Sequence, residues 1–207
     1  MYRLRPSRHT PLALLVAGAF ALQGCASALI GAGATAGVTA AQERGIKGAI
    51  SDTGIRAEIN HLWLQKNHQI FIDINLQIHE GRVLVTGATK DPQLRADAIQ
   101  LAWQASGVRE VINEVEVNDE GGVVNYARDT AINTELRARL LFAKDIDSIN
   151  YSIETVNGAV YMLGVAQDKN ELERVTEIAR NIANVRRVVS YVLLKDDPRR
   201  FAKPPAG

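Results

Sequence analysis

The side chains best able to bind a metal or catalyse a reaction are scattered along this 207-residue sequence. His61, His68 and His79 fall near one another, but their spacing matches no common metal-binding pattern. The carboxylates are spread over predicted helix faces and strand ends, so no pair is placed for general acid–base catalysis. Ser106 and Ser148 have no histidine that the sequence puts beside them. The sequence therefore predicts no enzyme, no catalytic residue, no metal, no cofactor and no small-molecule substrate.

The one cysteine, Cys25, has a different chemistry because it ends an apolar run at residues 12–22 that follows three arginines. This arrangement is typical of a secretory signal peptide, and the run is too short to span a bilayer comfortably. The segment Leu-Gln-Gly-Cys at residues 22–25 resembles a bacterial lipobox, where the thiol is diacylglycerylated and the chain is cut before it. The alternative is an ordinary cleaved signal followed by an incidental cysteine, but an unpaired exposed thiol is unfavourable in an oxidising compartment. We therefore expect Cys25 to be lipidated.

The residues after Cys25 indicate where such an anchor would hold the chain. Ala26 stands where an aspartate favours inner-membrane retention in enterobacteria, so the chain resembles the class sorted to the outer membrane. Residues 26–50 are rich in alanine and glycine, but they follow no strand and lack the spacing of a phosphate-binding loop. We expect a flexible tether. The predicted location is the outer membrane, lipid-anchored and facing the periplasm.

The charge of the chain argues against a nucleic-acid partner. Removal of residues 1–24 deletes three arginines and no acid, so the net charge falls from +1 to −2. Nucleic-acid binding usually needs a strongly basic surface. The charge is uneven, because residues 52–118 carry six basic and nine acidic side chains, whereas residues 127–194 carry nine of each.

The rest of the chain is organised by an internal repeat. Gly81-Arg-Val-Leu-Val-Thr-Gly87 returns as Gly158-Ala-Val-Tyr-Met-Leu-Gly164, 77 residues later, and the same offset aligns Asp52-Thr53 with Asp129-Thr130. No gap is needed across the unit, so the chain holds two copies of one module. Each copy is near the lower size limit for a self-sufficient core, so we expect the modules to lean on each other.

Both copies follow one order of elements. Asp52 and Asp129 predict helix N-caps, and apolar residues then recur at helical spacing, including Trp63 in the first copy. Alternating residues predict the next strand, which would include Ile70, Ile72 and Ile149. A turn at Glu80-Gly81 or Asn157-Gly158 leads to a second strand, followed by a helix opened by Asp91-Pro92 or Asp168 and a closing strand.

The predicted fold is α+β, with two tandem α-β-β-α-β modules, each a three-stranded sheet with two helices on one face. The expected divisions are a signal peptide, a lipid-anchored flexible tether, a first module, a linker, a second module and a disordered tail, at residues 1–24, 25–50, 51–118, 119–126, 127–195 and 196–207.

The strand Gly-x-Val-x-Val-x-Gly at 81–87 and the segment Gly107-Val-Arg-Glu-Val-Ile-Asn-Glu-Val115 resemble the BON domain. The second copy departs mildly, with Asn184 for the glycine and Ser190 for the asparagine. A lipobox followed by two such modules is similar to the dual-BON outer-membrane lipoproteins. The resemblance implies association with phospholipid surfaces and a non-catalytic role in maintaining the bacterial envelope.

The opening helix of the second copy is the candidate lipid contact. Helical spacing turns Ile132, Leu136 and Leu140 toward the core and places apolar and basic side chains elsewhere on the helix. Leucine and arginine together suit shallow insertion among anionic headgroups. The expected phospholipid-binding residues are Arg128, Arg137, Arg139, Leu141, Phe142 and Lys144.

Two alternatives remain open from the sequence. Leu141 and Phe142 could pack against the linker or the other module, as Leu64 stands at the position equivalent to Leu141. The modules could also be a non-catalytic scaffold that docks an envelope assembly machine, with a hot spot near Trp103, which lies off the best apolar stripe of its helix.

Overall fold

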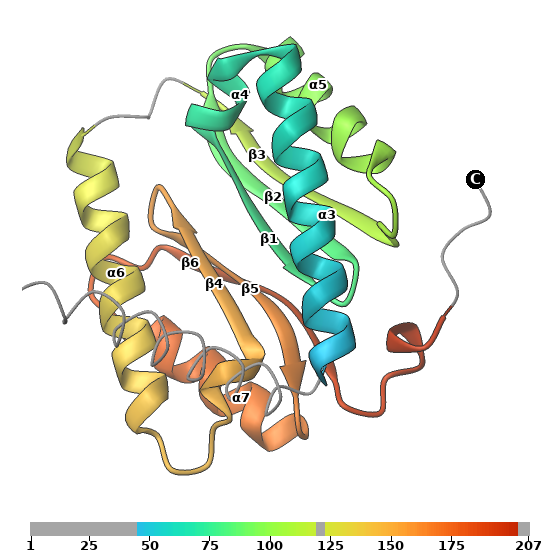
Figure 1. Cartoon of the computed structure of the whole chain (residues 1–207). Helices are drawn as coiled ribbons and strands as arrows, with labels where there is room; N and C mark the ends of the chain where they lie inside the picture. The colour runs from blue at the N-terminus through green and yellow to red at the C-terminus, as the bar shows by residue number, and fades with distance from the viewer. Residues whose placement is uncertain (1–44, 119–122, 203–207) are drawn as a thin grey trace, which may run out of the picture. The chain divides into compact units, whose positions relative to one another are not determined.

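The computed structural model describes residues 45–118 and 123–202, and both modules belong to one unit, Ala41–Gly207 (Figure 1). The expected signal peptide, Cys25, residues 25–44 of the expected tether and residues 203–207 of the tail lie outside the described residues. In the part of the chain that the structure describes, no helix is long and apolar enough to cross a membrane.

The predicted element order is present in both modules. The first contains α3 (Gly45–Lys66), α4 (His68–Asp73), β1 (Ile74–His79), β2 (Arg82–Thr89), α5 (Pro92–Gln104) and β3 (Glu110–Val117). The second contains α6 (Val123–Phe142), η1 (Ser148–Asn150), β4 (Tyr151–Val156), β5 (Ala159–Ala166), α7 (Lys169–Arg180) and β6 (Arg187–Leu194), followed by η2 (Pro198–Arg200). Helices α3 and α6 begin before the expected module starts, so residues 45–50 and 123–126 are helical, where a tether and a linker were expected.

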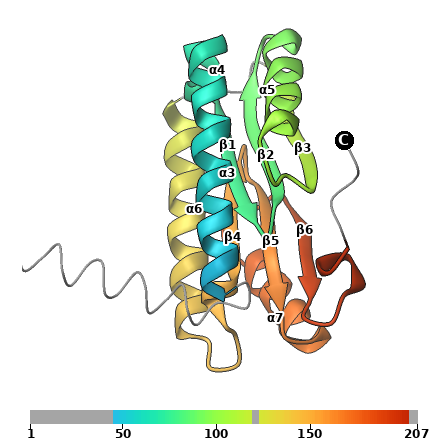
Figure 2. The same ribbon diagram turned by 45° about the vertical axis from the view of Figure 1, so that its right-hand side comes forward.

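Each module has a mixed three-stranded sheet, which confirms the α+β prediction. The orders are β1-β2-β3 and β4-β5-β6, with an antiparallel first pair and a parallel second pair in both. Helices α3 and α5 cover one face of the first sheet, and α6 and α7 cover one face of the second (Figures 1 and 2).

The prediction for the first strand was wrong at its start. Ile70 and Ile72 belong to the short helix α4, and Ile149 belongs to η1. Asn67 caps α4, because its side chain accepts a hydrogen bond from the Gln69 N–H. This cap begins a helix at His68, so Ile70 and Ile72 are helical although their alternation predicted a strand.

The N-cap prediction for Asp52 and Asp129 was also wrong, because their helices begin several residues earlier. Both carboxylates are buried and accept hydrogen bonds from the hairpin turn of their own module. Asp129 accepts from the N–H groups of Asn157 and Gly158 at 2.7 and 2.8 Å, and Asp52 does the same for Glu80 and Gly81. Each aspartate therefore ties its opening helix to the turn between its two antiparallel strands.

The glycines of the repeated strand have a steric cause. Gly164 has a φ of +148°, and a Cβ placed there would lie 2.0 Å from the carbonyl oxygen of Asn150. Gly87 repeats this close approach with Asp73, at 2.3 Å. The strand can therefore pass its neighbour only without a side chain at these positions.

The helix-facing side of each sheet forms a separate core. Trp63 continues the predicted core stripe, is 1% exposed, and donates its indole N–H to the Ala98 carbonyl at 3.0 Å. The corresponding buried stripe of α6 consists of Ile132, Leu136 and Leu140. This burial confirms the helical stripes predicted from the sequence.

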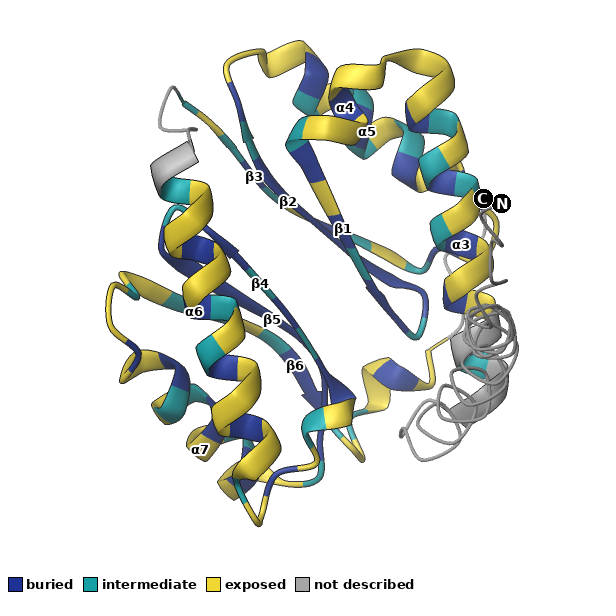
Figure 3. Ribbon diagram, turned by 60° about the vertical axis from the view of Figure 1, so that its left-hand side comes forward, coloured by how far each residue is buried: buried dark blue, intermediate teal, exposed yellow. Residues whose placement is uncertain are grey.

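The opposite faces of the two sheets share a third core, which confirms that the modules lean on each other. Leu84 and Ile112 of the first module cluster with Val156, Tyr161 and Leu163 of the second. Both faces of β2 and β5 are thus covered, so nearly every residue in these strands is buried (Figure 3).

The contact between modules joins equivalent positions of the repeat. Gln77 donates to Glu154 at 3.1 Å, and Tyr191 donates to Glu114; each pair is 77 residues apart, which is the repeat offset. Contacts between equivalent positions are the mark of an isologous, two-fold interface. The two modules are therefore arranged like the halves of a symmetric dimer.

The segment after β6 was expected to be disordered, but residues 196–202 return to the first module. Arg200 is buried and forms an ion pair with Glu80 at 2.6 Å. Arg109 donates to the carbonyls of Arg199, Arg200 and Ala202. We call residues 195–202 the C-terminal strap, because the buried ion pair and these bonds fasten it across the first module.

Candidate functional site

The C-terminal end of α6 carries two strongly exposed apolar side chains. Leu141 is 66% exposed and Phe142 is 83% exposed, while the preceding residue, Leu140, is buried. Figure 3 shows the exposed face running along α6. The alternative in which Leu141 and Phe142 pack against the linker or the other module does not fit this exposure.

The predicted basic residues divide between two sides of this helix. Arg137 and Arg139 are two residues apart, which separates them by about 200° around an α-helix. Arg139 forms an ion pair with Glu135 at 2.5 Å, and Arg128 donates to Asn125 at 3.2 Å. The six predicted residues therefore form no single patch.

Lys144 follows the end of α6 in an acidic neighbourhood. It is exposed and shares a depression with four carboxylates and with Arg174, which pairs with Asp145 at 2.6 Å; the carboxylates are those of Asp145, Asp147, Asp168 and Glu171. These carboxylates offset its positive charge, so Lys144 is a weaker candidate for an anion than Arg128.

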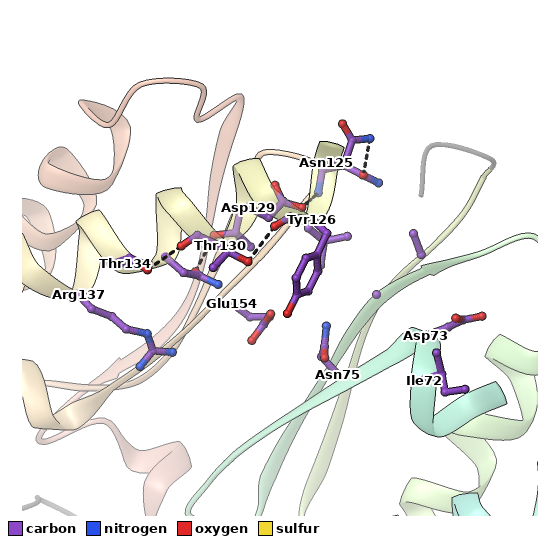
Figure 4. A pocket seen from close by; sticks show the side chains of 16 residues that line it. Ile72, Asp73, Asn75, Asn125, Tyr126, Asp129, Thr130, Thr134, Arg137 and Glu154 are labelled. Carbon is purple, nitrogen blue, oxygen red and sulfur yellow. Dashed lines mark hydrogen bonds between the residues drawn. The ribbon is translucent and has the colours of Figure 1, made fainter. Parts of the chain in front are cut away.

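Arg137 turns toward the first module. Its Nη2 donates to the Ile153 carbonyl at 2.7 Å, which holds the guanidinium over the edge strand β4. There it lines a cavity of about 400 Å³ between the modules, which we call the inter-module groove. Figure 4 shows Arg137 and Glu154 reaching into this groove from the second module, with Asn75 facing them from the first.

The groove contains polar and aromatic side chains from both modules. Tyr126, at the start of α6, is 75% exposed and its ring stands over the opening (Figure 4). Asp73 and Ile72 lie on the opposite wall. This site was not predicted from the sequence, because Tyr126 was assigned to a linker and the sequence does not show that β1 and β4 lie near each other. The equivalence of Gln77 and Glu154 in the repeat was the available signal.

The groove's electrostatics centre on Glu154. Burial raises the pKa of its carboxyl, and the hydrogen bond from Gln77 and the charge of Arg137 oppose this rise only in part. Asp129 adds to the rise in pKa through its negative charge. The ionised carboxylate of Glu154 is therefore incompletely compensated by its surroundings.

The other candidate residues lie elsewhere. His61 and His68 are exposed, whereas His79 is buried. Among the described residues, no group of three histidine, cysteine or acidic side chains is placed to hold a metal ion. Trp103 is 46% exposed on α5, as expected from its position off the apolar stripe.

The repeated fold is that of a known family. The BON domain matches residues 51–119 and again residues 128–196, so the chain belongs to the BON-domain family, with two copies of the domain.

Three relatives align with two thirds or more of the chain. It is 27% identical to the outer membrane lipoprotein DolP of Haemophilus influenzae over 180 residues, covering 86% of this chain and 92% of that protein. It is 42% identical over 152 residues to an uncharacterized protein of Anaplasma centrale, covering 73% and 99%. It is 27% identical to the osmotically inducible protein Y of Escherichia coli, covering 67% and 70%. The chain is thus a dual BON-domain protein similar to DolP.

Proposed function

We propose that this protein is a periplasm-facing outer-membrane lipoprotein that binds anionic phospholipid through α6 of its second BON domain and maintains envelope integrity. The observation that carries the proposal is the exposure of Leu141 and Phe142 at the end of an amphipathic helix that also carries Arg128, Arg137 and Arg139. The lipobox at Cys25 and the similarity to a protein named as an outer membrane lipoprotein support the location.

Three contributions to membrane binding add together. The acyl anchor confines the domains to the membrane surface, so even a weak contact is repeatedly formed. Leu141 and Phe142 then enter the boundary between headgroups and acyl chains, where each buried apolar side chain contributes about 1–2 kcal/mol. Each basic side chain near an anionic surface adds about 1 kcal/mol at low salt. This role needs no catalytic group.

The test is co-sedimentation of residues 26–207 with vesicles of phosphatidylcholine, with and without phosphatidylglycerol, at two salt concentrations. We expect binding that requires the anionic lipid and weakens with salt. Leu141→Glu and Arg137→Glu should reduce binding about tenfold or more, because each removes a favourable contact and adds a repelled charge.

A matched control is Leu64→Glu, which changes the equivalent leucine of the first domain, 45% exposed. It should leave vesicle binding unchanged. If residues 26–207 stay off anionic vesicles at low salt, the proposal is wrong for the domains, and Cys25 is their sole membrane contact.

A second function is a scaffold for an envelope assembly machine, and the exposure of Trp103 favours it. A scaffold predicts a hot spot on α5 that is indifferent to lipid and salt. Trp103→Ala would then disturb the envelope in cells without changing vesicle binding. Leu141→Glu, in contrast, would weaken vesicle binding in vitro.

A further inference from the structure

The inter-module groove has an excess of negative charge that nothing in the lipid contact of α6 uses. Its walls carry three carboxylates, Asp73, Asp129 and Glu154, and one guanidinium, that of Arg137. Both oxygens of Asp129 already accept N–H groups of the hairpin turn, and Asp73 accepts a hydrogen bond from Gln69. Glu154 is therefore the carboxylate best placed to receive a ligand.

A bound cation would stabilise the carboxylate of Glu154. It projects from β4 toward the first module and is half-buried, and Gln77 supplies a neutral hydrogen bond to one of its oxygens at 3.1 Å. Arg137 does not pair with it in the described residues, because its guanidinium is held on the Ile153 carbonyl. An ammonium group beside Glu154 would supply both the missing charge and the missing donors.

The groups around Glu154 suit a small ammonium ion. Tyr126 lines the same groove as Glu154, and an aromatic face attracts a cation electrostatically. Asn75 faces the same space from β1 (Figure 4), and its side-chain amide includes an oxygen that can accept a hydrogen bond. Carboxylate, aromatic ring and amide oxygen together form a site for a cation with several N–H donors.

Arg137 lies in the same groove on the other side of Glu154 (Figure 4). Its Nη2 donates to the Ile153 carbonyl, and the guanidinium, which has five N–H donors in all, lines the groove. An arginine in this position suits a phosphate. Cation site and anion site therefore lie next to each other, as in the recognition of a zwitterion.

We propose that the inter-module groove binds a phosphoethanolamine group, with its ammonium against Glu154 and Tyr126 and its phosphate against Arg137. The cavity of about 400 Å³ has room for such a group and its ordered waters. This proposal deepens the proposed lipid function, because Leu141 lies one turn beyond Arg137 on the same side of α6. A lipid whose phosphate rests on Arg137 can thus run its acyl chains past Leu141.

The test uses the mature protein with its anchor, purified in detergent micelles and observed by NMR. Glycerophosphoethanolamine is titrated first, and glycerophosphoglycerol, which has a phosphate but no amine, is titrated as its counterpart. We expect the first ligand to shift the resonances of Asn75, Tyr126 and Glu154 and the second to leave them nearly unchanged. Nanodiscs with and without phosphatidylethanolamine then show whether a membrane lipid supplies the same group as the free compound does.

Variants make the assignment specific. Glu154→Gln keeps the shape and the amide partner but removes the charge, and should weaken binding of glycerophosphoethanolamine about tenfold or more. Tyr126→Ala should weaken it less, because a cation–π contact at an exposed site is worth about 0.5–1 kcal/mol. Glu173→Gln, an exposed acid on α7, is the matched control and should change nothing.

The outcomes separate this proposal from the lipid function on which it rests. Equal shifts with both ligands, or a Glu154→Gln variant that binds as the wild type does, would overturn it while leaving anionic-vesicle binding through α6 intact. Groove shifts specific for glycerophosphoethanolamine without any binding to anionic vesicles would support the groove and sink the proposed function of α6.

Discussion

The ion pair between Arg200 and Glu80 allows a quantitative test of the C-terminal strap. The pair is bidentate, with Nε and Nη2 of Arg200 at 3.0 and 2.6 Å from the two Glu80 oxygens, and Nη1 donates to the Lys195 carbonyl. The two side chains are 6% and 14% exposed. Removal of one partner from a buried pair costs about 3–5 kcal/mol.

We therefore expect Arg200→Ala to lower the free energy of unfolding by about 3 kcal/mol, the lower end, since water reaches Glu80 once the strap lifts. For a protein of about 150 to 250 residues this corresponds to a fall in Tm of about 6–12 °C. Thermal and urea unfolding followed by circular dichroism measure both quantities. Arg199→Ala is the neighbouring control, because Arg199 is 72% exposed and pairs with Asp197 at the surface. It should leave Tm unchanged.

The pH dependence gives an independent check of the same pair. Burial by itself would raise the pKa of Glu80, but the hydrogen bond and charge of Arg200 outweigh it and lower the pKa in the folded protein. A carboxyl with a lowered folded pKa stabilises the fold above its unfolded pKa of about 4.3, and this contribution is lost as the pH falls through the folded value. The difference between wild type and Arg200→Ala should therefore shrink in acid. Equal Tm values for Arg200→Ala and Arg199→Ala at pH 7, or no coupling in a double-mutant cycle with Glu80→Ala, would refute this account.

Three further outcomes are expected. Asp129→Ala should cost about 2–4 kcal/mol in urea unfolding, because two turn N–H groups lose their acceptor, whereas Asp129→Asn should cost less since it keeps one acceptor oxygen. Gly164→Ala should lower the free energy of unfolding by about 3 kcal/mol or more, since its Cβ meets the Asn150 carbonyl. Gly54→Ala, in open space on helix α3, should raise it by up to about 1 kcal/mol. Similar thermal unfolding of the two variants would contradict the steric argument. Glu154→Gln should gain stability relative to wild type as pH rises from 4 to 8, because the raised pKa of Glu154 means that its favourable contribution is lost as it ionises; a pH-independent difference in Tm would contradict this.

The sequence by itself determined what depends on neighbouring residues. Asp91 and Asp168 cap α5 and α7 as predicted, and Asn184 adopts a left-handed φ of +67°, as Gly107 does in the first copy. Glu80-Gly81 and Asn157-Gly158 form the predicted turns, each with two positive φ values. These signals are readable because a cap or a tight turn is decided by the backbone of about four residues. The ungapped repeat then carried the same assignments to the second copy.

Only the tertiary structure decided where the long side chains point. Asp129 looked like a cap, but it holds a turn 28 residues away, and Arg137 lies 16 residues from the carbonyl that holds it over the groove. Arg200, in a segment expected to be disordered, pairs with Glu80, 120 residues earlier. In each case the partner is distant in sequence. The contacts of Asp129 and Arg137 form because α6 packs on the second sheet, whereas the Arg200–Glu80 pair forms because the two uncovered sheet faces bury their apolar residues against each other. Hydrophobic burial is non-directional, so the pattern of a single strand predicts that its face is covered but not which residues then meet across the joint.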